Sequence, residues 1–388
     1  MKTNPGGSLS PSEVVGRDAL IKQLWRALEK QSVVLSAERR MGKTSIIKKM
    51  HAESAGKLTV YQDLEKVGTP REFVESIVES VEERLSTGKR VAEGFRSLLQ
   101  NLHGAEVSGI KLPEVADREW KVLLVAIIKD LVAKPGGTVY FFWDELPLML
   151  YKIQKNSGET VAMEILDTLR SLRQTYPLLR MVYTGSIGLH NVLTSLKRAG
   201  YANAPINDMK KIDVPALQLI DAENLALQLI MGENIQVADP QIIAKTIAQS
   251  VDGIAFYVQH VVDRLANWQG TIEAKTIKDI VSNYLCDAQD PLDMRYFQER
   301  IKTYYLREEV SLAYGLLDIL STETVAISFG NLANKLASRM AIHDLEAIRS
   351  MVELLQLDHY IQQNPEGNYA FRFPLIQRYW KLNRGLSH

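Results

Sequence analysis

Short apolar runs alternate with amphipathic helical patterns over the first half of the chain. Apolar runs predict buried parallel strands at residues 33–35, 59–61, 138–143 and 180–183. Apolar positions at helical spacing predict helices between them, at residues 20–28, 70–85, 117–131 and 162–172. Strands that alternate with helices imply right-handed crossovers and a parallel sheet covered on both faces, so the predicted fold class is α/β.

After residue 215 the pattern becomes almost entirely helical. Helices are predicted at residues 222–231, 240–249, 254–268 and 272–285, before a linker at 289–291. Further helices reach about residue 320 and then cover 329–336 and 342–357. A hairpin follows at 360–373, with Pro365–Asn368 as its turn. Helices followed by such a hairpin favour a winged helix-turn-helix.

These patterns divide the chain into four parts. We expect a flexible tail at residues 1–13, an α/β core at 14–215, a helical lid at 216–288 and a winged-helix domain at 291–388. Within the core, residues from about 86 to 115 are irregular and rich in glycine, which suggests an insertion or a regulatory loop.

Composition narrows the functional classes only slightly. The 388 residues include 46 basic and 46 acidic side chains, so no net charge draws the chain toward nucleic acid or a membrane surface. Cys286 is the only cysteine, which excludes an internal disulfide. The N-terminal residues lack the apolar segment of a secretory signal, and no apolar run is long enough to cross a bilayer. We therefore expect a cytoplasmic protein with no membrane partner.

The turn after the first apolar run fits the phosphate-binding pattern G-x-x-x-x-G-K-[ST]. The matching residues are Ala37, Glu38, Arg39, Arg40, Met41, Gly42, Lys43 and Thr44, with Ser45 directly after them. Backbone N–H groups of such a loop, at the mouth of a helix, bind anions. Lys43 would reach the β- and γ-phosphates, and the Thr44 hydroxyl would ligate Mg²⁺. The alternative is a lysine-bearing turn without a ligand.

The first position of this pattern holds Ala37 instead of glycine. An alanine held there at positive φ would cost about 1 kcal/mol. Gly42 still allows the backbone to approach a phosphate closely, so we interpret the loop as a nucleotide site.

Two carboxylates, Asp144 and Glu145, end the apolar run at 138–143. The carboxyl ends of strands are where open α/β sheets bind ligands. With a phosphate loop, this arrangement is typical of nucleoside triphosphatases: Asp144 would hold Mg²⁺ through water, and Glu145 would orient and deprotonate the attacking water. The alternative is a pair of solvated acids at a strand end.

These motifs resemble the AAA+ and STAND groups of P-loop ATPases, and in particular prokaryotic members similar to the archaeal ATPase and origin-recognition families. The matching segments are Val15-Gly16-Arg17-Asp18 (flanking adenine), Arg39–Thr44 (Walker A), Phe142–Glu145 (Walker B), Thr184-Gly185-Ser186 (the sensor-1 strand end) and Gly253-Ile254-Ala255 (the lid). STAND proteins carry Gly-x-Pro at the lid position, and Ala255 replaces that proline here.

The resemblance implies the ligands and the roles of the matching residues. ATP and ADP, with Mg²⁺, would be bound by Val15, Gly16, Arg17, the loop residues 37–45 and Gly253. Thr184 or Ser186 would contact the γ-phosphate or the attacking water, beside Lys43 and Glu145. An arginine should complete the site, supplied in cis or by a neighbouring subunit of a homo-oligomer. Arg173, between the Walker B and sensor-1 segments, is the candidate, although an arginine there is more often exposed and solvated.

Two functions remain open for such an ATPase. One is a switch that binds duplex DNA through basic residues of its winged helix: Lys335, Arg339, Arg349, Arg372, Arg378, Lys381 and Arg384. The other is a STAND-like signalling switch that binds a protein partner after nucleotide exchange. Residues 290–388 hold eleven Lys/Arg against twelve Asp/Glu, which suits the second reading. A scaffold that binds nucleotide without hydrolysing it is a third alternative.

Overall fold

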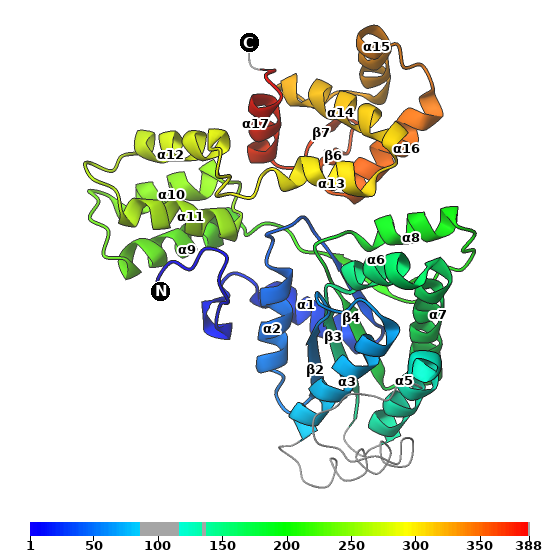
Figure 1. The fold of residues 1–388 in the computed structure, drawn as a ribbon. Coiled ribbons are helices and arrows are strands. Elements are labelled where there is room, and N and C mark those ends of the chain that lie inside the picture. The colour runs from blue at the N-terminus through cyan, green and yellow to red at the C-terminus, as the bar shows by residue number, and fades with distance from the viewer. Residues whose placement is uncertain (86–115, 134–136, 387–388) are drawn as a thin grey trace. The chain divides into compact units, whose positions relative to one another are not determined.

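A computed structural model describes residues 1–85, 116–133 and 137–386 of the chain. The irregular segment predicted at 86–115 lies outside these residues. Contacts divide the chain into two compact units (Figure 1). The sheet unit consists of Ser10–Ser36 and Lys43–Val214, and the helical unit of Met1–Leu9, Ala37–Gly42 and Pro215–His388.

The described part of the sheet unit contains a five-stranded sheet in the order β2-β3-β4-β1-β5. Its strands are β1 (Val33–Ser36), β2 (Leu58–Asp63), β3 (Val139–Asp144), β4 (Leu179–Tyr183) and β5 (Lys210–Asp213), and all neighbours pair in parallel. The predicted α/β class and parallel sheet are confirmed. Since all strands run the same way, their carboxyl ends meet at one edge of the sheet.

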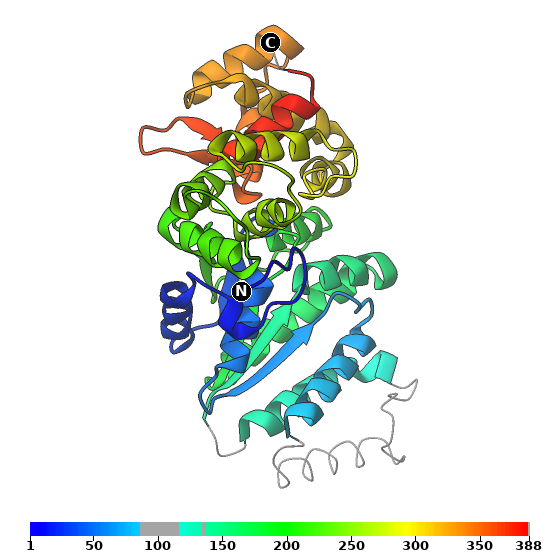
Figure 2. The same cartoon turned by 90° about the vertical axis from the view of Figure 1, so that its left-hand side faces the viewer.

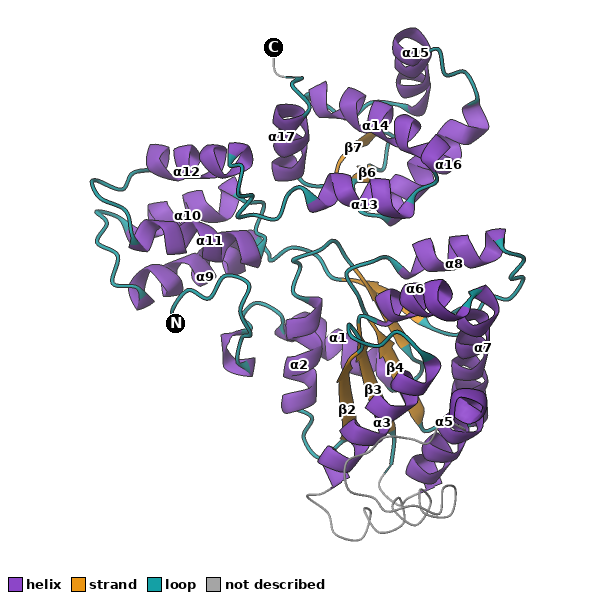
Figure 3. Cartoon of the chain, in the orientation of Figure 1, coloured by secondary structure: helices purple, strands orange, loops and turns teal. Residues whose placement is uncertain are grey.

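Strand β3 shows why its sequence is a continuous apolar run. Its two faces pack against different helices, so every position is buried. Trp25 of α1 (Asp18–Leu28) makes edge-on ring contacts with Tyr140 and Phe142, while Phe73 of α3 (Pro70–Leu85) contacts Trp143 on the other face. Figure 3 shows the strands enclosed by helices.

Further helices of the sheet unit follow the strands in chain order. They are η1 (Pro11–Glu13), α2 (Lys43–Ala52), α5 (Ala116–Ala133), α6 (Leu146–Ser157), α7 (Glu159–Thr175) and α8 (Leu189–Arg198). The apolar pattern did not predict α6, α8 or β5. The short edge strand β5 buries only one of its four side chains, and an isolated apolar position gives no periodic signal.

The helical unit contains two helix clusters joined through the segment 287–295. The first cluster is α9 (Leu219–Gly232), α10 (Pro240–Ser250), α11 (Ala255–Ala266) and α12 (Ala274–Cys286). The second is α13 (Tyr296–Tyr304), α14 (Arg307–Thr322), α15 (Phe329–Met340), α16 (Leu345–Leu357) and α17 (Pro374–Asn383). Helix α17 touches α12 and α14, so the two clusters share contacts.

The predicted hairpin is present as β6 (Ile361–Gln363) and β7 (Tyr369–Phe371), paired antiparallel. Gly367, at φ 84°, occupies the left-handed position of its turn. Figure 2 shows the hairpin extending away from the helices of its unit. None of the helices within the described ranges has both the length and the apolar content that a membrane span requires.

Candidate functional site

Lys43 and Thr44 form the first turn of α2, directly after the phosphate-loop pattern. The Thr44 hydroxyl donates a hydrogen bond to the carboxylate of Asp144, the last residue of β3, and the Lys43 ammonium lies close enough to attract that carboxylate. Lys43 is 7% exposed and Asp144 is 3% exposed. The structure therefore brings together the lysine, the hydroxyl and the carboxylate that the sequence placed in two separate motifs.

Asp144 has a second set of neighbours on strand β2. Asp63 is its register partner, and the Tyr61 hydroxyl donates to its Oδ2 at 3.4 Å. Burial raises the pKa of Asp144, and the nearby Asp63 carboxylate raises it further, against the hydrogen bond from Thr44 and the charge of Lys43. Additional positive charge at this position would therefore favour the ionised form of Asp144.

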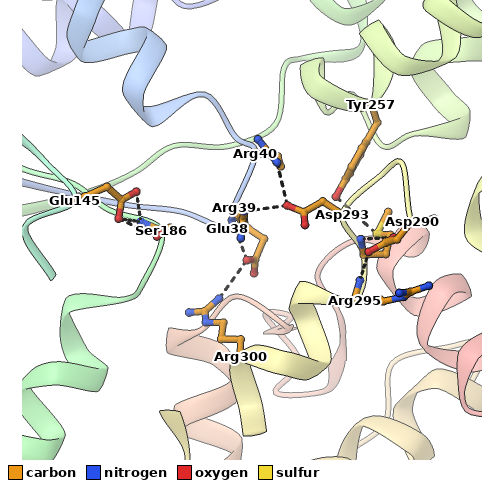
Figure 4. A network of polar contacts seen from close by, with 11 residues as sticks. Glu38, Arg39, Arg40, Glu145, Ser186, Tyr257, Asp290, Asp293, Arg295 and Arg300 are labelled. Carbon is orange, nitrogen blue, oxygen red and sulfur yellow. Dashed lines mark hydrogen bonds and ion pairs between the residues drawn. The ribbon is translucent and has the colours of Figure 1, made fainter. Parts of the chain in front are cut away.

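Glu145 follows Asp144 in a left-handed conformation, with φ 58° and ψ 27°. This turn aims its carboxylate at Ser186, just beyond β4. The Ser186 amide donates to both carboxylate oxygens at 2.9 Å, and the Ser186 hydroxyl donates to Oε2 at 2.8 Å (Figure 4). Burial raises the pKa of Glu145, although the bonds from Ser186 oppose the shift. A raised pKa makes a carboxylate a better proton acceptor near neutral pH.

The two residues before Ser186 complete this edge of the sheet. Thr184 is 1% exposed, and its Oγ1 has no hydrogen-bond partner among the described residues. A buried hydroxyl of this kind points to a water or a ligand that the protein atoms do not supply. At Gly185 a Cβ would lie 2.8 Å from Cδ of Pro147 and 3.3 Å from Oε2 of Glu145, so only glycine fits beside the glutamate.

The segment expected to flank adenine is attached to the helix that begins with Lys43. Lys49 of α2 donates from Nζ to the carbonyl of Pro11 at 3.1 Å and to that of Val14 at 3.3 Å. Val15 and Gly16 follow in a loop, with Gly16 at φ 67°, and the buried Arg17 precedes α1. A displacement of α2 would therefore also move this segment.

The phosphate-loop residues 37–42 make their contacts within the helical unit. The positive φ angles of the loop occur at Arg40 (69°) and Gly42 (86°). Ala37 does not have a positive φ, so the cost considered for an alanine at the first position does not arise. Glu38 and Met41 are buried, at 2% and 3% exposure, whereas Arg39 and Arg40 are partly exposed. Ser45 lies beyond the loop in α2.

Two of the predicted site residues have structural roles in the observed contacts. A Cβ at Gly253, which has φ 67°, would lie 2.6 Å from the carbonyl oxygen of Leu217, and the Gly253 carbonyl accepts from the Leu217 amide at 3.1 Å. This glycine therefore allows two backbone segments to pair closely. The structure gives it no contact that resembles a ligand site.

The candidacy of Arg173 as an arginine finger is wrong. Its side chain is 3% exposed, and it makes a bidentate pair with Asp208, at 2.8 Å to each oxygen. It also donates to the Tyr183 hydroxyl at 2.6 Å and to the Pro205 carbonyl at 2.5 Å. A guanidinium held by these contacts cannot reach a nucleotide on another subunit.

Sequence reasoning missed three residues at this edge: Tyr61, Asp63 and Pro147. The signal for the first two was available, because the second apolar run ends at Asp63 and parallel strands bring their carboxyl ends together. Pro147 gave no signal, because its contact with Gly185 depends on how the turn into α6 folds.

Comparisons with known proteins give a fold. No protein-family model matches the chain, and no curated protein sequence matches it. A solved structure of the Walker-type ATPase of Pyrococcus abyssi is similar, with a TM-score of 0.64 and 15% identity, over 95% of this chain and 97% of that one. The ORC2 protein of Aeropyrum pernix, in ADPNP–ADP complexes, is similar with a TM-score of 0.56 and 12% identity, over 97% of each chain. At these identities the likeness shows that the chain has the fold of these proteins.

Proposed function

We propose that this chain binds ATP with Mg²⁺ and hydrolyses it, as a nucleotide-dependent switch of the AAA+/STAND type. The observation that carries the proposal is the meeting of Lys43 and Thr44, at the start of α2, with Asp144 at the end of β3. An anion-binding helix start beside a buried carboxylate suits a phosphate with a divalent cation and suits few other ligands. The fold shared with a Walker-type ATPase supports the same reading.

The donor set fits magnesium. No group of three or more His, Cys, Asp or Glu side chains in the described ranges is placed to hold a metal ion by itself. Mg²⁺ in nucleotide sites keeps several waters and needs only one or two protein oxygens beside the phosphates, and the Thr44 hydroxyl and the Asp144 carboxylate supply them. When bound, the ion would neutralise charge on the β- and γ-phosphates. Lys43 would add a second positive charge at the same phosphates.

Glu145 is the proposed general base. Its raised pKa suits proton abstraction from water, and it lies next to the proposed metal ligand. In the observed state both of its oxygens accept bonds from Ser186, which lowers their basicity. We infer that Glu145 leaves Ser186 when it takes a proton from the attacking water. The buried Thr184 hydroxyl would then contact the γ-phosphate or that water.

The primary experiment measures ATP affinity by titration and phosphate release by the wild-type chain. Tight binding with measurable release supports the ATPase. Binding without release above the buffer rate would support the alternative of a nucleotide-binding scaffold. Absence of ATP binding at millimolar concentrations would contradict the proposed site itself.

The second cluster of the helical unit is proposed to be a winged helix that binds a protein partner. Its helices precede a β-hairpin in the expected order. Several of its basic side chains are already paired with acids: Lys335 with Glu323, Arg349 with Glu346, and Arg384 with Asp318. Together with the near-neutral charge of residues 290–388, this pairing leaves little excess positive charge for a phosphate backbone.

Duplex DNA remains the second candidate partner because one observation favours it. After Glu366 the chain has no acidic residue, whereas Arg372, Arg378 and Lys381 lie on or beside α17. Phosphate release should be measured with and without duplex DNA between 50 and 200 mM salt. Stimulation that falls steeply with salt would select DNA, and a DNA-independent rate would select the protein partner. The molecular mass with ATP and with ADP would show whether nucleotide exchange drives homo-oligomer assembly.

A further inference from the structure

The phosphate loop carries a buried carboxylate that occupies a donor of the loop itself. Glu38 is 2% exposed, and its Oε1 accepts the Arg39 amide at 2.8 Å. The same oxygen accepts from Nη1 of Arg300 in α13 at 3.1 Å. Arg300 is also paired with Asp358 at the end of α16, and Asp358 in turn accepts from the Tyr305 hydroxyl at 2.6 Å. A chain of buried charges therefore connects the loop to the second helix cluster (Figure 4).

The two arginines of the loop are bound by a different acid of the same unit. Asp293 accepts from Nε of Arg39 at 3.0 Å and from Nη2 of Arg40 at 3.1 Å. The Arg39 guanidinium also lies 4.3 Å from the ring centre of Tyr296, and that of Arg40 lies 4.3 Å from the ring centre of Phe256. Each arginine is thus held by one carboxylate and one aromatic face.

These contacts direct the positive groups of the loop toward protein carboxylates. A phosphate chain in a loop of this type needs the same groups, namely loop amides and nearby cations. Glu38 and Asp293 would also repel an incoming polyphosphate while they remain in place. The observed contacts and phosphate binding therefore compete.

We propose that the contacts of Glu38, Arg39 and Arg40 with Arg300 and Asp293 form an autoinhibitory clamp on the phosphate loop. The clamp holds the loop in a state of low nucleotide affinity. ATP must release it, and a partner that draws α13 away from the loop would raise the affinity for ATP. By linkage, ATP would raise the affinity for that partner by the same factor. This inference rests on the proposed ATP site and names its regulation.

Asp293 offers the cleanest variant. It has φ 57°, a backbone conformation that Asn also tolerates, and its side chain is 30% exposed, so Asp293→Asn removes the charge without emptying a core position. Partly exposed ion pairs contribute up to about 1 kcal/mol each, so the loss of two should lower the Kd for ATP about fivefold to tenfold. Without nucleotide, the amides of residues 37–42 should exchange hydrogen faster than in the wild type.

The control variant is Glu346→Gln, which neutralises an acid paired with Arg349 in α16 of the same unit. It should leave both measurements unchanged. In an Arg39→Gln/Arg40→Gln background, Asp293→Asn should have no further effect on ATP affinity. A persistent effect there would show simple repulsion and overturn the clamp.

The outcomes separate the clamp from the ATP site. If the wild type binds ATP but Asp293→Asn has an unchanged Kd and unchanged exchange, the clamp is wrong and the site stands. If neither protein binds ATP although the loop amides of Asp293→Asn exchange faster, the proposed function is wrong and only the contact is real.

Discussion

Lys43 and Glu145 carry two separable parts of the proposed chemistry. Lys43 is buried at the start of a helix, where its ammonium can only serve an anion or the neighbouring Asp144. Glu145 lies one residue beyond that aspartate, and its own bonds go to Ser186. One residue should therefore determine binding and the other turnover.

Replacing Lys43 by alanine should abolish ATP binding. The substitution removes the charge that faces the β- and γ-phosphates and leaves Asp144 with less compensation. Isothermal titration with ATP measures the effect, and Lys22→Ala, an exposed lysine of α1, is the matched control. An unchanged affinity for Lys43→Ala would contradict the phosphate-loop assignment.

Replacing Glu145 by glutamine should preserve ATP binding and reduce turnover by a factor on the order of 10²–10⁴. Glutamine keeps the shape and can still accept bonds from Ser186, but it cannot take a proton. Phosphate release and ATP affinity should be measured on the same preparation. Glu159→Gln, at the exposed start of α7, is the control. Hydrolysis near the wild-type rate would remove Glu145 from the role of base.

At the scale of elements, the sheet unit depends on connections that no single strand supplies. Arg173 of α7 joins the side chain of Tyr183 in β4 to Asp208 and to the Pro205 carbonyl, which precede β5. The edge strand β5 has little apolar burial, so these polar bonds help to fix the chain that enters it.

Replacing Arg173 by alanine should lower the free energy of unfolding by about 2–3 kcal/mol, since Asp208 and the Tyr183 hydroxyl lose their partner. Urea unfolding measures this, with Arg26→Ala, on the exposed face of α1, as the control. ATP affinity should change little. Wild-type stability combined with lost turnover would restore the arginine finger that the structure argues against.

At the scale of the whole molecule, one buried acid connects the two helix clusters. Asp252, just after α10, accepts from the Leu375 amide in the first turn of α17 at 2.7 Å. Burial raises the pKa of Asp252 to about 6, although the Leu375 amide and the charge of Arg378 oppose the shift. The folded chain therefore keeps this proton at pH values where the unfolded chain has lost it.

Stability should consequently fall as the pH rises from about 4 to about 6 and should then level off. Asp252→Asn should remove this dependence and raise the free energy of unfolding at pH 7, by an amount on the order of 2–3 kcal/mol. Asparagine tolerates the φ of 54° at this position and can still accept the Leu375 bond. Urea unfolding from pH 4 to 8, followed by circular dichroism, tests this. A variant that is less stable than the wild type at pH 7 would show that the ionised carboxylate stabilises the fold.

Local pattern predicted most of the elements, because strand and helix periodicity is written in neighbouring residues. The buried run of β3 and the stripes of α3 and α7 are examples. Elements with weak or short patterns, such as β5 and α8, were missed. The two acids at the end of β3 and the lysine at the start of α2 were found from motifs alone.

The sequence by itself determined the α/β class, the phosphate-loop pattern and the acids that face it, since each depends on residues close together in the chain. Only the tertiary structure decided what these residues touch. The bond between Glu145 and Ser186 spans 41 positions, and the ion pair between Glu38 and Arg300 spans 262. Such partners are chosen by how separate elements pack, and periodicity along the chain carries no information about that choice.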